Sequence, residues 1–374
     1  MNSSASFGVI GGAGRTGKAV AKELRRSTDK AILIGGRNLP KLEAVAAELG
    51  AAVSAVRLDV HDPRSLERFC GRCSIVVNCG GPVSELQDKV AQAALRTRCH
   101  YVDVAGLTLV PEAMMPHDQE FSDLGVACVM SAGWLPGMTE LLPAYSLAVS
   151  KTRMDEIHSV TTYSGDSGDW SNSAMRDIVW YLRKFGRLRP KYIRKGEWVR
   201  AKLAEILIEK NLGAPIGRRL FSVSCLPEMA VLLGRLKNCN GRAYTYLPSR
   251  STAFVGSLIA LVPLPTEFAI RRMRAALLAE FLPVGGFSVV EIQGRSEASE
   301  VTHRYQATFE KGREYWINGV VAATVARLIS YGGAVKTGVH FLTEAVDPVA
   351  FMQELRKIGV SQMESFSATG GDLG

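Results

Sequence analysis

The feature that most constrains this chain is a glycine-rich turn directly after its first apolar run. Residues Phe7–Ile10 predict a short buried strand, and the periodic segment 16–26 predicts a helix. Between them runs Gly-Gly-Ala-Gly-Arg-Thr-Gly, residues 11–17. A strand that enters a helix through closely spaced glycines brings the helix N-terminus against the backbone of the turn. This order predicts the first βα unit of a dinucleotide-binding fold.

The same alternation continues to about residue 131. Short apolar runs are separated by longer segments of helical periodicity, and Asp62-Pro63 is a typical helix start. The further predicted strands are 31–35, 53–59, 74–79, 100–104 and 126–131, and the helices between them are 39–49, one that starts at 62–63, 85–96 and one near 111–124. Six such units predict a parallel, doubly wound α/β sheet of the Rossmann type.

Each glycine of the turn has an expected task. Gly12 makes the tight turn, Gly14 lets a pyrophosphate approach the backbone, and Gly17 lets helix and strand pack closely. The N-terminus of the helix then faces the phosphates. A glycine-rich turn that binds no ligand is the alternative.

The end of the second strand favours NADP over NAD. An acidic residue there would accept a hydrogen bond from the adenosine ribose of NAD and repel a 2′-phosphate. This chain has Gly35-Gly36-Arg37 instead, so that a guanidinium can bond to a 2′-phosphate and stack on adenine. Arg37 as an ordinary surface arginine is the alternative.

Two further stretches follow predicted strands and are expected to line the cofactor crevice. Asp59-Val60 comes after the third strand, where a carboxylate can accept from the adenine amino group. Residues 78–82 follow the fourth strand, where Gly80 and Gly81 leave room for the ribose on the nicotinamide side. Either stretch is also compatible with a plain turn.

A second domain is expected, because 374 residues exceed what one hydrophobic core usually serves. The βα alternation stops near residue 133. Strand-like runs then occur over 157–163, 242–247, 288–294 and 301–309. We therefore predict a nucleotide domain over 1–133 and an α+β substrate domain with a mainly antiparallel sheet over 134–335.

Cysteine usage and apolar runs indicate a cytoplasmic protein without a metal site. The seven cysteines are scattered, and the pair Cys70 and Cys73 has no second pair or nearby histidine to complete a tetrahedral site. Residues 1–6 lack the features of a secretory signal, and the apolar run 253–265 is too short to span a bilayer.

Basic residues are concentrated in one segment of this chain of net charge +9. Residues 176–202 hold ten Lys/Arg against Asp177 and Glu197. Such a field attracts an anionic partner, such as a carboxylate, a carrier protein or a membrane surface, although a solvated helix face has the same pattern. The chain has no zinc finger or helix-turn-helix motif, so we expect no nucleic-acid partner. The arginine-bearing apolar segment 253–283 favours a lid or interface over membrane contact.

The polar loop 163–173 leads into a predicted amphipathic helix and holds most of the candidates for substrate chemistry. Ser171 to Ser173 are candidate N-caps, and Arg176 in the first turn can bind a substrate carboxylate. A connecting loop with a capped helix is the alternative. The side chains that can transfer a proton are Asp103, His158, Tyr163, Asp166 and Asp169. None of them lies in a catalytic motif.

Six motifs in order resemble the saccharopine dehydrogenase and saccharopine reductase-like family of NAD(P)-dependent oxidoreductases. They are GGAGRTG, GGRN, RLDVHD, VVNCGGP, YVDVAG and AGWLPGMTELL. Residues 7–140 and about 325–360 carry the resemblance. It implies cofactor contacts by Gly12, Gly14, Arg15, Thr16, Gly17, Arg37, Asp59, Val60, Asn78, Gly80, Gly81, Pro82, Ala105 and Gly106. Many members have Glu after this last glycine, whereas Leu107 stands here, which puts an acidic substrate contact at that point in doubt.

The resemblance also implies a reaction and an assembly. Hydride would pass between nicotinamide C4 and an imine or amine carbon of a small or carrier-bound substrate, in a homodimer whose segment 336–374 returns to the nucleotide domain. The candidate catalytic residues are Asp103, Tyr163, Asp169 and Arg176. The alternatives are reduction of a carbonyl or an activated C=C bond, and a non-catalytic NADP sensor or scaffold. No Tyr-x-x-x-Lys follows the fourth strand to support a carbonyl mechanism.

Overall fold

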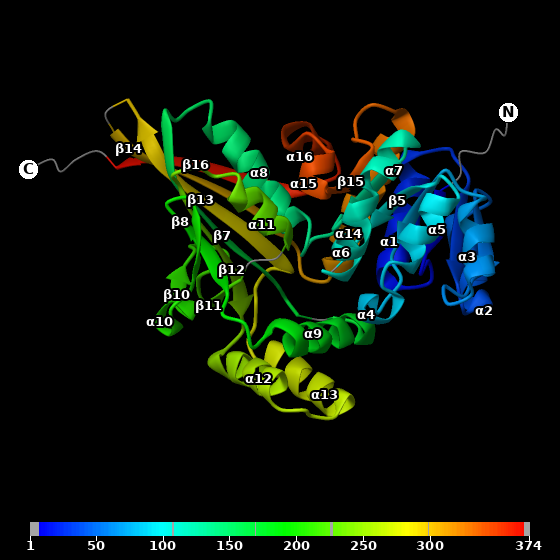
Figure 1. Ribbon diagram of the computed structural model, residues 1–374, viewed down its shortest axis with the longest axis horizontal. Helices are drawn as coiled ribbons and strands as arrows, with labels where there is room; N and C mark the ends of the chain where they lie inside the picture. Colours follow the sequence, from blue (N-terminus) through cyan, green and yellow to red (C-terminus); the bar gives the residue numbers. More distant parts are fainter. Residues whose placement is uncertain (1–6, 107, 169, 225–226, 298, 370–374) are drawn as a thin grey trace, which may run out of the picture. The chain divides into compact units, whose positions relative to one another are not determined.

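The computed structural model describes residues 7–106, 108–168, 170–224, 227–297 and 299–369, and these form two compact units. The first unit comprises Met1–Met138 and Tyr315–Ile358. The second comprises Thr139–Glu314 and Gly359–Gly374. Figure 1 shows the elements of each unit along the chain.

The first unit is built on a sheet of seven parallel strands in the order β15-β6-β5-β4-β1-β2-β3. Its strands are β1 (Phe7–Ile10), β2 (Ile32–Gly36), β3 (Val53–Arg57), β4 (Ile75–Asn78), β5 (His100–Asp103), β6 (Ala127–Met130) and β15 (Gly338–Phe341). The order turns back at β1, which lies between β2 and β4. Such a switch point opens a crevice beyond the carboxyl ends of the strands. The predicted doubly wound α/β fold is confirmed.

Helices complete the first unit. They are α1 (Arg15–Ser27), α2 (Leu39–Leu49), α3 (Pro63–Cys70), α4 (Val83–Leu86), α5 (Lys89–Arg96), α6 (Leu109–Met114), the 3₁₀ turn η1 (Met115–His117), α7 (Asp118–Asp123), α14 (Glu314–Tyr331), α15 (Leu342–Ala345) and α16 (Pro348–Lys357). Asn38 and Asp62 cap α2 and α3, each with a proline in the first turn, which is why these helices start where they do.

Helix α14 belongs to the first unit, although the expected domain boundary at 335 places it in the second. It crosses α1 closely, since a Cβ built on Gly319 would lie 2.5 Å from the Cβ of Ala19. A glycine is needed for this approach. The following strand, β15, extends the parallel sheet beside β6.

The second unit contains a nine-stranded, mostly antiparallel sheet. Its path is β10-β11-β12-β7-β13-β14-β16, with β8 paired to β12 and β9, and only the β12–β7 pair on this path is parallel. The strands are β7 (Glu156–Asp166), β8 (Lys191–Arg194), β9 (Glu197–Arg200), β10 (Leu207–Asn211), β11 (Arg218–Val223), β12 (Asn240–Leu247), β13 (Gly286–Ser296), β14 (Ser299–Phe309) and β16 (Ser361–Thr369). The four predicted strands correspond to β7, β12, β13 and β14.

The end of the chain divides between the units. Segment 338–357 lies in the first unit, but β16 pairs antiparallel with β14 of the second sheet. The expectation that 336–374 returns as a whole to the nucleotide domain therefore differs from the structure beyond residue 358. Edge pairing of β16 with β14 satisfies backbone groups that β14 would otherwise leave open.

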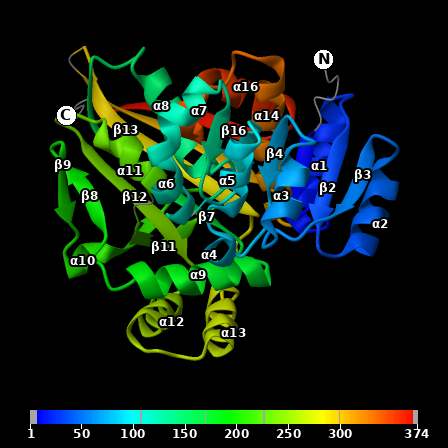
Figure 2. The ribbon, with the colours of Figure 1, turned by 45° about the vertical axis from the view of Figure 1, so that its right-hand side comes forward.

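The remaining helices of the second unit are α8 (Met138–Ser150), α9 (Asn172–Phe185), α10 (Leu203–Ile206), α11 (Pro227–Gly234), α12 (Arg250–Leu261) and α13 (Thr266–Leu277). The predicted apolar face of α9 buries Met175 and Val179 against Ile259 of α12 and Ile270 of α13. Figure 2 shows α9 above the pair formed by α12 and α13. Among the described residues, no helix has the length and apolar character needed to cross a membrane.

Candidate functional site

The glycine turn lies at the carboxyl end of β1, but two of its glycines have structural roles that differ from the prediction. Gly11, with φ +77°, makes the reversal that was assigned to Gly12. Gly12 instead packs on β2, because a Cβ there would lie 2.6 Å from the Cβ of Ile34. The sequence could not separate the two, since both are glycines in an unbroken pair.

The start of α1 is open to an anion. Gly14 is its N-cap and provides no side chain to satisfy the first N–H groups, and the first turn holds no acidic residue. Gly17 lies against the turn so closely that a Cβ would be 2.2 Å from the carbonyl oxygen of Gly11. Uncapped N–H groups at the positive end of a helix fit a pyrophosphate. The turn thus has the geometry that a dinucleotide requires.

Tyr315 is a residue of this site that the sequence reasoning missed. The Arg15 guanidinium lies 3.9 Å from the centre of the Tyr315 ring, which α14 brings to the glycine turn. On the same helix, Asn318 Oδ1 accepts a hydrogen bond of 2.9 Å from the backbone N–H of Trp134. A cation held over a ring face loses rotamer freedom. We infer that α14 fixes the position of Arg15 at the start of α1.

Replacing Tyr315 tests this positioning. Tyr315→Leu should raise the Kd for NADPH about tenfold, because a cation–π contact contributes about 0.5–2 kcal/mol. Tyr315→Phe keeps the ring and should bind NADPH like the unaltered chain, as measured by nicotinamide fluorescence. Equal affinities for the Leu and Phe variants would show that the ring does not act through Arg15.

The adenosine-side candidates lie after β2 and β3. Arg37 is exposed and directly follows β2, as expected for a residue that meets a 2′-phosphate. Asp59 is also exposed, but its Oδ1 accepts from the N–H of His61 at 3.0 Å, so it shapes the turn in which Val60 lies. The adenine contact of Asp59 stays a prediction.

A buried hydrogen-bond chain joins the ends of β4 and β5. Asn78 Nδ2 donates to the Tyr101 hydroxyl at 3.2 Å, and this hydroxyl donates to Asp103 Oδ2 at 2.7 Å. Asn78 Oδ1 accepts from the N–H of Gly80 at 3.0 Å. All three side chains are buried. Asn78 therefore orders the segment that contains Gly80, Gly81 and Pro82. Tyr101 connects Asn78 to Asp103 and so to the loop after β5. The sequence did not single out Tyr101, because it lies in an apolar strand pattern.

The Asp103 carboxylate organises the loops after β5 and β6. Its Oδ1 accepts from the N–H of Ala105 at 2.8 Å, and the backbones of Gly106 and Ser131 also hydrogen-bond to it. Gly106 has φ +59°, a conformation that favours glycine. Burial raises the pKa of Asp103 to about 6, although the hydrogen bonds act in the opposite direction. With 1% of its surface exposed, Asp103 has the geometry of a positioning residue, and a catalytic role stays a prediction.

The other candidate catalytic residues belong to the second unit. Tyr163 is buried in the aromatic core, stacked on Tyr244 with ring centres 5.3 Å apart, and burial raises its pKa further above the ordinary value. A tyrosine so placed is a poor acid at neutral pH. Asp166 is half-buried, and its Oδ1 accepts from the N–H of Gly168 at 2.9 Å. Asp169 lies outside the described residues.

His158 and Arg176 lie at the surface. His158 is 40% exposed and lies 3.9 Å from Glu156 and 3.7 Å from Glu300. Arg176 forms an ion pair with Glu267 that joins α9 to α13. Ser171 caps α9 as predicted, with its Oγ accepting from the N–H of Ala174. The carboxylate site proposed at this helix start therefore has protein partners already in place.

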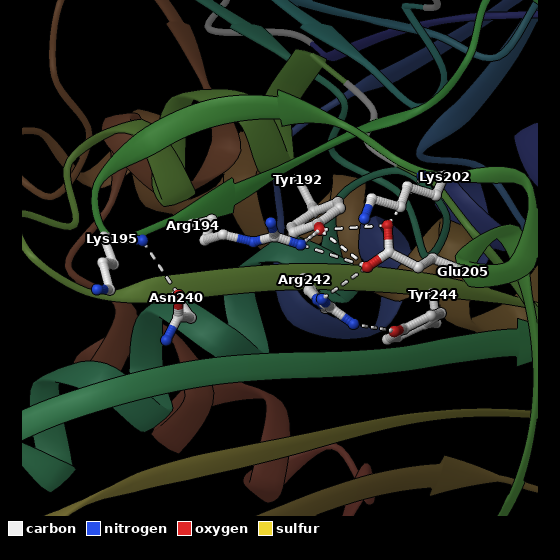
Figure 3. A network of polar contacts seen from close by, with 8 residues as sticks. All are labelled: Tyr192, Arg194, Lys195, Lys202, Glu205, Asn240, Arg242 and Tyr244. Carbon is white, nitrogen blue, oxygen red and sulfur yellow. Dashed lines mark hydrogen bonds and ion pairs between the residues drawn. The ribbon is translucent and has the colours of Figure 1, made fainter.

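Much of the basic segment 176–202 is also used inside the second unit. Figure 3 shows Arg194 and Arg242 close to the Tyr192 ring, both directed at Glu205, with distances of 3.3 and 3.7 Å to its Oε1. The N–H of Lys202 donates to Glu205 at 2.8 Å, and this bond lowers the pKa of that carboxyl. The cluster ties β8 and α10 to β12.

Comparisons with known proteins agree with the nucleotide-binding geometry. Residues 7–129 match the family model for the saccharopine dehydrogenase NADP binding domain. This match confirms the resemblance seen in the sequence and identifies the segment as an NADP-binding domain of that type.

Curated relatives are similar over parts of the chain. A probable mitochondrial saccharopine dehydrogenase-like oxidoreductase of Arabidopsis thaliana is 30% identical over 31% of this chain and 28% of its own length. Carboxyaminopropylagmatine dehydrogenase of Synechocystis is 28% identical over 43% of this chain and 42% of its own. The trans-acting enoyl reductase of Mycobacterium leprae is 27% identical over 34% and 31%. The chain thus spans less than half the length of each of these relatives.

Among solved structures, saccharopine dehydrogenase (L-Glu forming) of Saccharomyces cerevisiae has the same fold. The match covers 96% of this chain and 99% of the yeast chain, with a TM-score of 0.63 and 13% sequence identity. It extends through both units and confirms the expected fold class.

Proposed function

We propose that this chain is an NADP-dependent oxidoreductase that transfers a hydride between the nicotinamide ring and the carbon of a C=N or CH–NH group. The observation that carries the proposal is the uncapped start of α1 at Gly14, within a domain that matches an NADP-binding family model. Two relatives, saccharopine dehydrogenase and carboxyaminopropylagmatine dehydrogenase, bear names that indicate C–N chemistry. The substrate would be a small or carrier-bound amine or imine.

The residues of the first unit would bind and orient the cofactor. The N–H groups of Arg15, Thr16 and Gly17 would hold the pyrophosphate, and Arg37 the 2′-phosphate. The bound cofactor supplies or accepts the hydride at nicotinamide C4. The chain of Asn78, Tyr101 and Asp103 would hold the surrounding loops rigid, so that the nicotinamide half is fixed before substrate arrives.

A proton donor is not required by this scheme. Reduction of a preformed iminium carbon yields an amine directly, so positioning and exclusion of water are the main demands on the protein. This agrees with the burial of Asp103 and Tyr163, which the structure uses in packing and loop order.

The second candidate is reduction of an activated C=C bond. It is favoured by the similarity of this chain to the trans-acting enoyl reductase of Mycobacterium leprae, one of its curated relatives. Such a reaction delivers hydride to a carbon conjugated with a carbonyl and needs a proton at the neighbouring carbon.

Titration and turnover test the function in two steps. NADPH and NADH are first titrated into the purified chain, and tight NADPH-selective binding is expected. Oxidation of NADPH is then followed with cyclic imines, with keto acid and amine pairs, and with enoyl thioesters. Turnover of only the thioesters would establish the second candidate. Tight binding without turnover of any class would indicate a sensor, and absence of binding would overturn both proposals.

Arg37→Ala tests the cofactor preference. The Kd for NADPH should rise about tenfold to a hundredfold, because charge-assisted hydrogen bonds contribute about 1.5–3 kcal/mol. The Kd for NADH, which lacks the 2′-phosphate, should stay unchanged. Lys22→Ala, an exposed residue of α1, is the matched control. Equal weakening of both nucleotides would remove Arg37 from phosphate recognition.

A further inference from the structure

Helix α12 and the residue after it present large apolar side chains to solvent. On α12, Phe254 is 68% exposed and Leu261 is 62% exposed, and Val262, directly after the helix, is 40% exposed. The spacing of seven residues places Phe254 and Leu261 along one stripe of the helix, and Val262 follows at the end of that helix. The opposite side buries Ile259 and Ala260. Among the described residues, the helix therefore has a packed face and a second face of exposed apolar side chains.

A second segment brings another apolar side chain to the end of this stripe. Arg187 Nε donates to the carbonyl oxygen of Ala260 at 2.8 Å, and its Nη2 donates to that of Leu261 at 3.2 Å. The neighbouring residue, Leu188, is 66% exposed. We call Leu188, Leu261, Val262 and Pro263 the hairpin tip. Figures 1 and 2 show the turn between α12 and α13 beyond α9, at the margin of the second unit.

The charge around the hairpin tip is positive. Residues 183–191 contain five Lys/Arg and no acidic residue, and residues 240–266 contain no acidic residue. Arg183 and Arg187 donate to backbone carbonyl oxygens. These contacts do not neutralise the positive charge of the two guanidinium groups. Lys184 and Arg189 are exposed. Exposed Leu, Val and Phe rimmed by Lys and Arg are typical of segments that enter the headgroup region of anionic bilayers.

This charge distribution argues against a second copy as the occupant. In a two-fold contact the same basic rim would face itself, and like charges would be brought together while the apolar surface was buried. An anionic lipid surface instead complements both the charge and the apolar side chains.

We propose that the hairpin tip inserts into the surface of an anionic lipid bilayer, with Lys184, Arg187 and Arg189 facing the phospholipid headgroups. This proposal differs from the sequence-based prediction, which favoured a lid or interface for segment 253–283. The contact is independent of the cofactor site and brings the second unit to a membrane where an apolar or lipid-borne substrate can be collected.

The test is flotation of the full chain with vesicles of phosphatidylcholine containing phosphatidylglycerol, against vesicles of phosphatidylcholine alone. Binding to the anionic vesicles is expected, weakened by salt. The double variant Leu261→Ser, Val262→Ser should lower the partition coefficient about tenfold or more, because two apolar side chains leave the bilayer. Arg189→Glu should weaken binding as well.

Met363→Ser is the matched control, since Met363 is 61% exposed on β16 of the same unit. It should leave vesicle binding unchanged, and all variants should keep the circular dichroism spectrum and the urea unfolding midpoint of the unaltered chain, which shows that they fold. Absence of vesicle binding, or binding that the tip variant does not change, would overturn the proposal. A soluble dimer that the tip variant dissociates would also overturn it and assign the tip to self-association.

Discussion

Gly17→Ala is expected to abolish tight binding of NADPH and to destabilise the first unit. The added Cβ would lie 2.2 Å from the carbonyl oxygen of Gly11 and 2.9 Å from the Cα of Gly12, so the collision is with backbone and no rotamer can relieve it. Either α1 or the glycine turn must shift, and the N–H groups of α1 then leave the position of the pyrophosphate. We expect a Kd for NADPH raised at least about a hundredfold, and about 1–3 kcal/mol lost from the free energy of unfolding.

Gly234→Ala is the matched control for this substitution. Gly234 lies at the end of α11, and a Cβ there would have no atom within 4 Å. Both NADPH affinity and the free energy of unfolding should stay close to those of the unaltered chain, as measured by fluorescence titration and urea unfolding. An undiminished affinity in Gly17→Ala would show that the turn does not bind the nucleotide.

Asp103→Ala is expected to have the second large effect, and its size should depend on pH. The substitution leaves the Tyr101 hydroxyl and the N–H of Ala105 without their buried acceptor, together with the backbone groups of Gly106 and Ser131. Unsatisfied buried groups cost about 1–3 kcal/mol each. We expect a loss of about 4 kcal/mol or more in the free energy of unfolding at about pH 5, and weaker NADPH binding because two loops lose their shared hydrogen-bond acceptor.

The direction of the pH dependence follows from the raised pKa of Asp103. Because the pKa rises from 3.8 to about 6 on folding, the folded state binds the proton more tightly than the unfolded state. The stability that this group provides is present below about pH 4 and is lost as the pH rises through about 6. The Ala variant has no such loss. The difference in the free energy of unfolding between the unaltered chain and the Asp103→Ala variant should therefore shrink by up to about 3 kcal/mol between about pH 4 and about pH 8.

Urea unfolding of the unaltered chain and the Asp103→Ala variant at about pH 4 and about pH 8 measures this difference in the free energy of unfolding. Asp29→Ala removes an exposed carboxylate of the same unit and should change the free energy by less than about 0.5 kcal/mol at either pH. A destabilisation by Asp103→Ala that grows with pH would mean that the carboxylate is stabilised in the folded chain, contrary to the burial described above.

Local sequence pattern predicted the elements whose partners are near in sequence. The strands β1 to β6 alternate with helices, and each is recognisable from its own apolar run. Helix α14 was not recognised as part of the first unit, because its contact with α1 joins Gly319 to Ala19, and nothing in either segment indicates the other. Its burial is also broad, with Val320, Val321 and Ala322 all buried, so it lacks a single apolar stripe.

The sequence located the glycine turn between β1 and α1 and placed Arg37 directly after β2, but it assigned to Gly12 the reversal that Gly11 makes. Binding of the cofactor by these residues stays a prediction. The side chains proposed for catalysis were harder to place, because a strand pattern does not show what lies across the sheet. Tyr163 stacks on Tyr244 only because β7 and β12 pair in parallel with these residues in register. Arg176 meets Glu267 through the packing of α9 on α13, about 90 residues away in sequence.

The division of the chain between the units has a consequence for its synthesis. The polypeptide passes from one unit to the other after Met138, Glu314 and Ile358, so each unit is made of two separate segments. When only the first 138 residues have emerged from the ribosome, β6 lacks its outer neighbour β15. Helix α1 likewise lacks α14, which packs against it in the complete unit. The nascent nucleotide domain then exposes an open parallel edge of the kind that pairs with other chains. We expect it to depend on chaperones, or to remain loosely folded, until the last segment emerges.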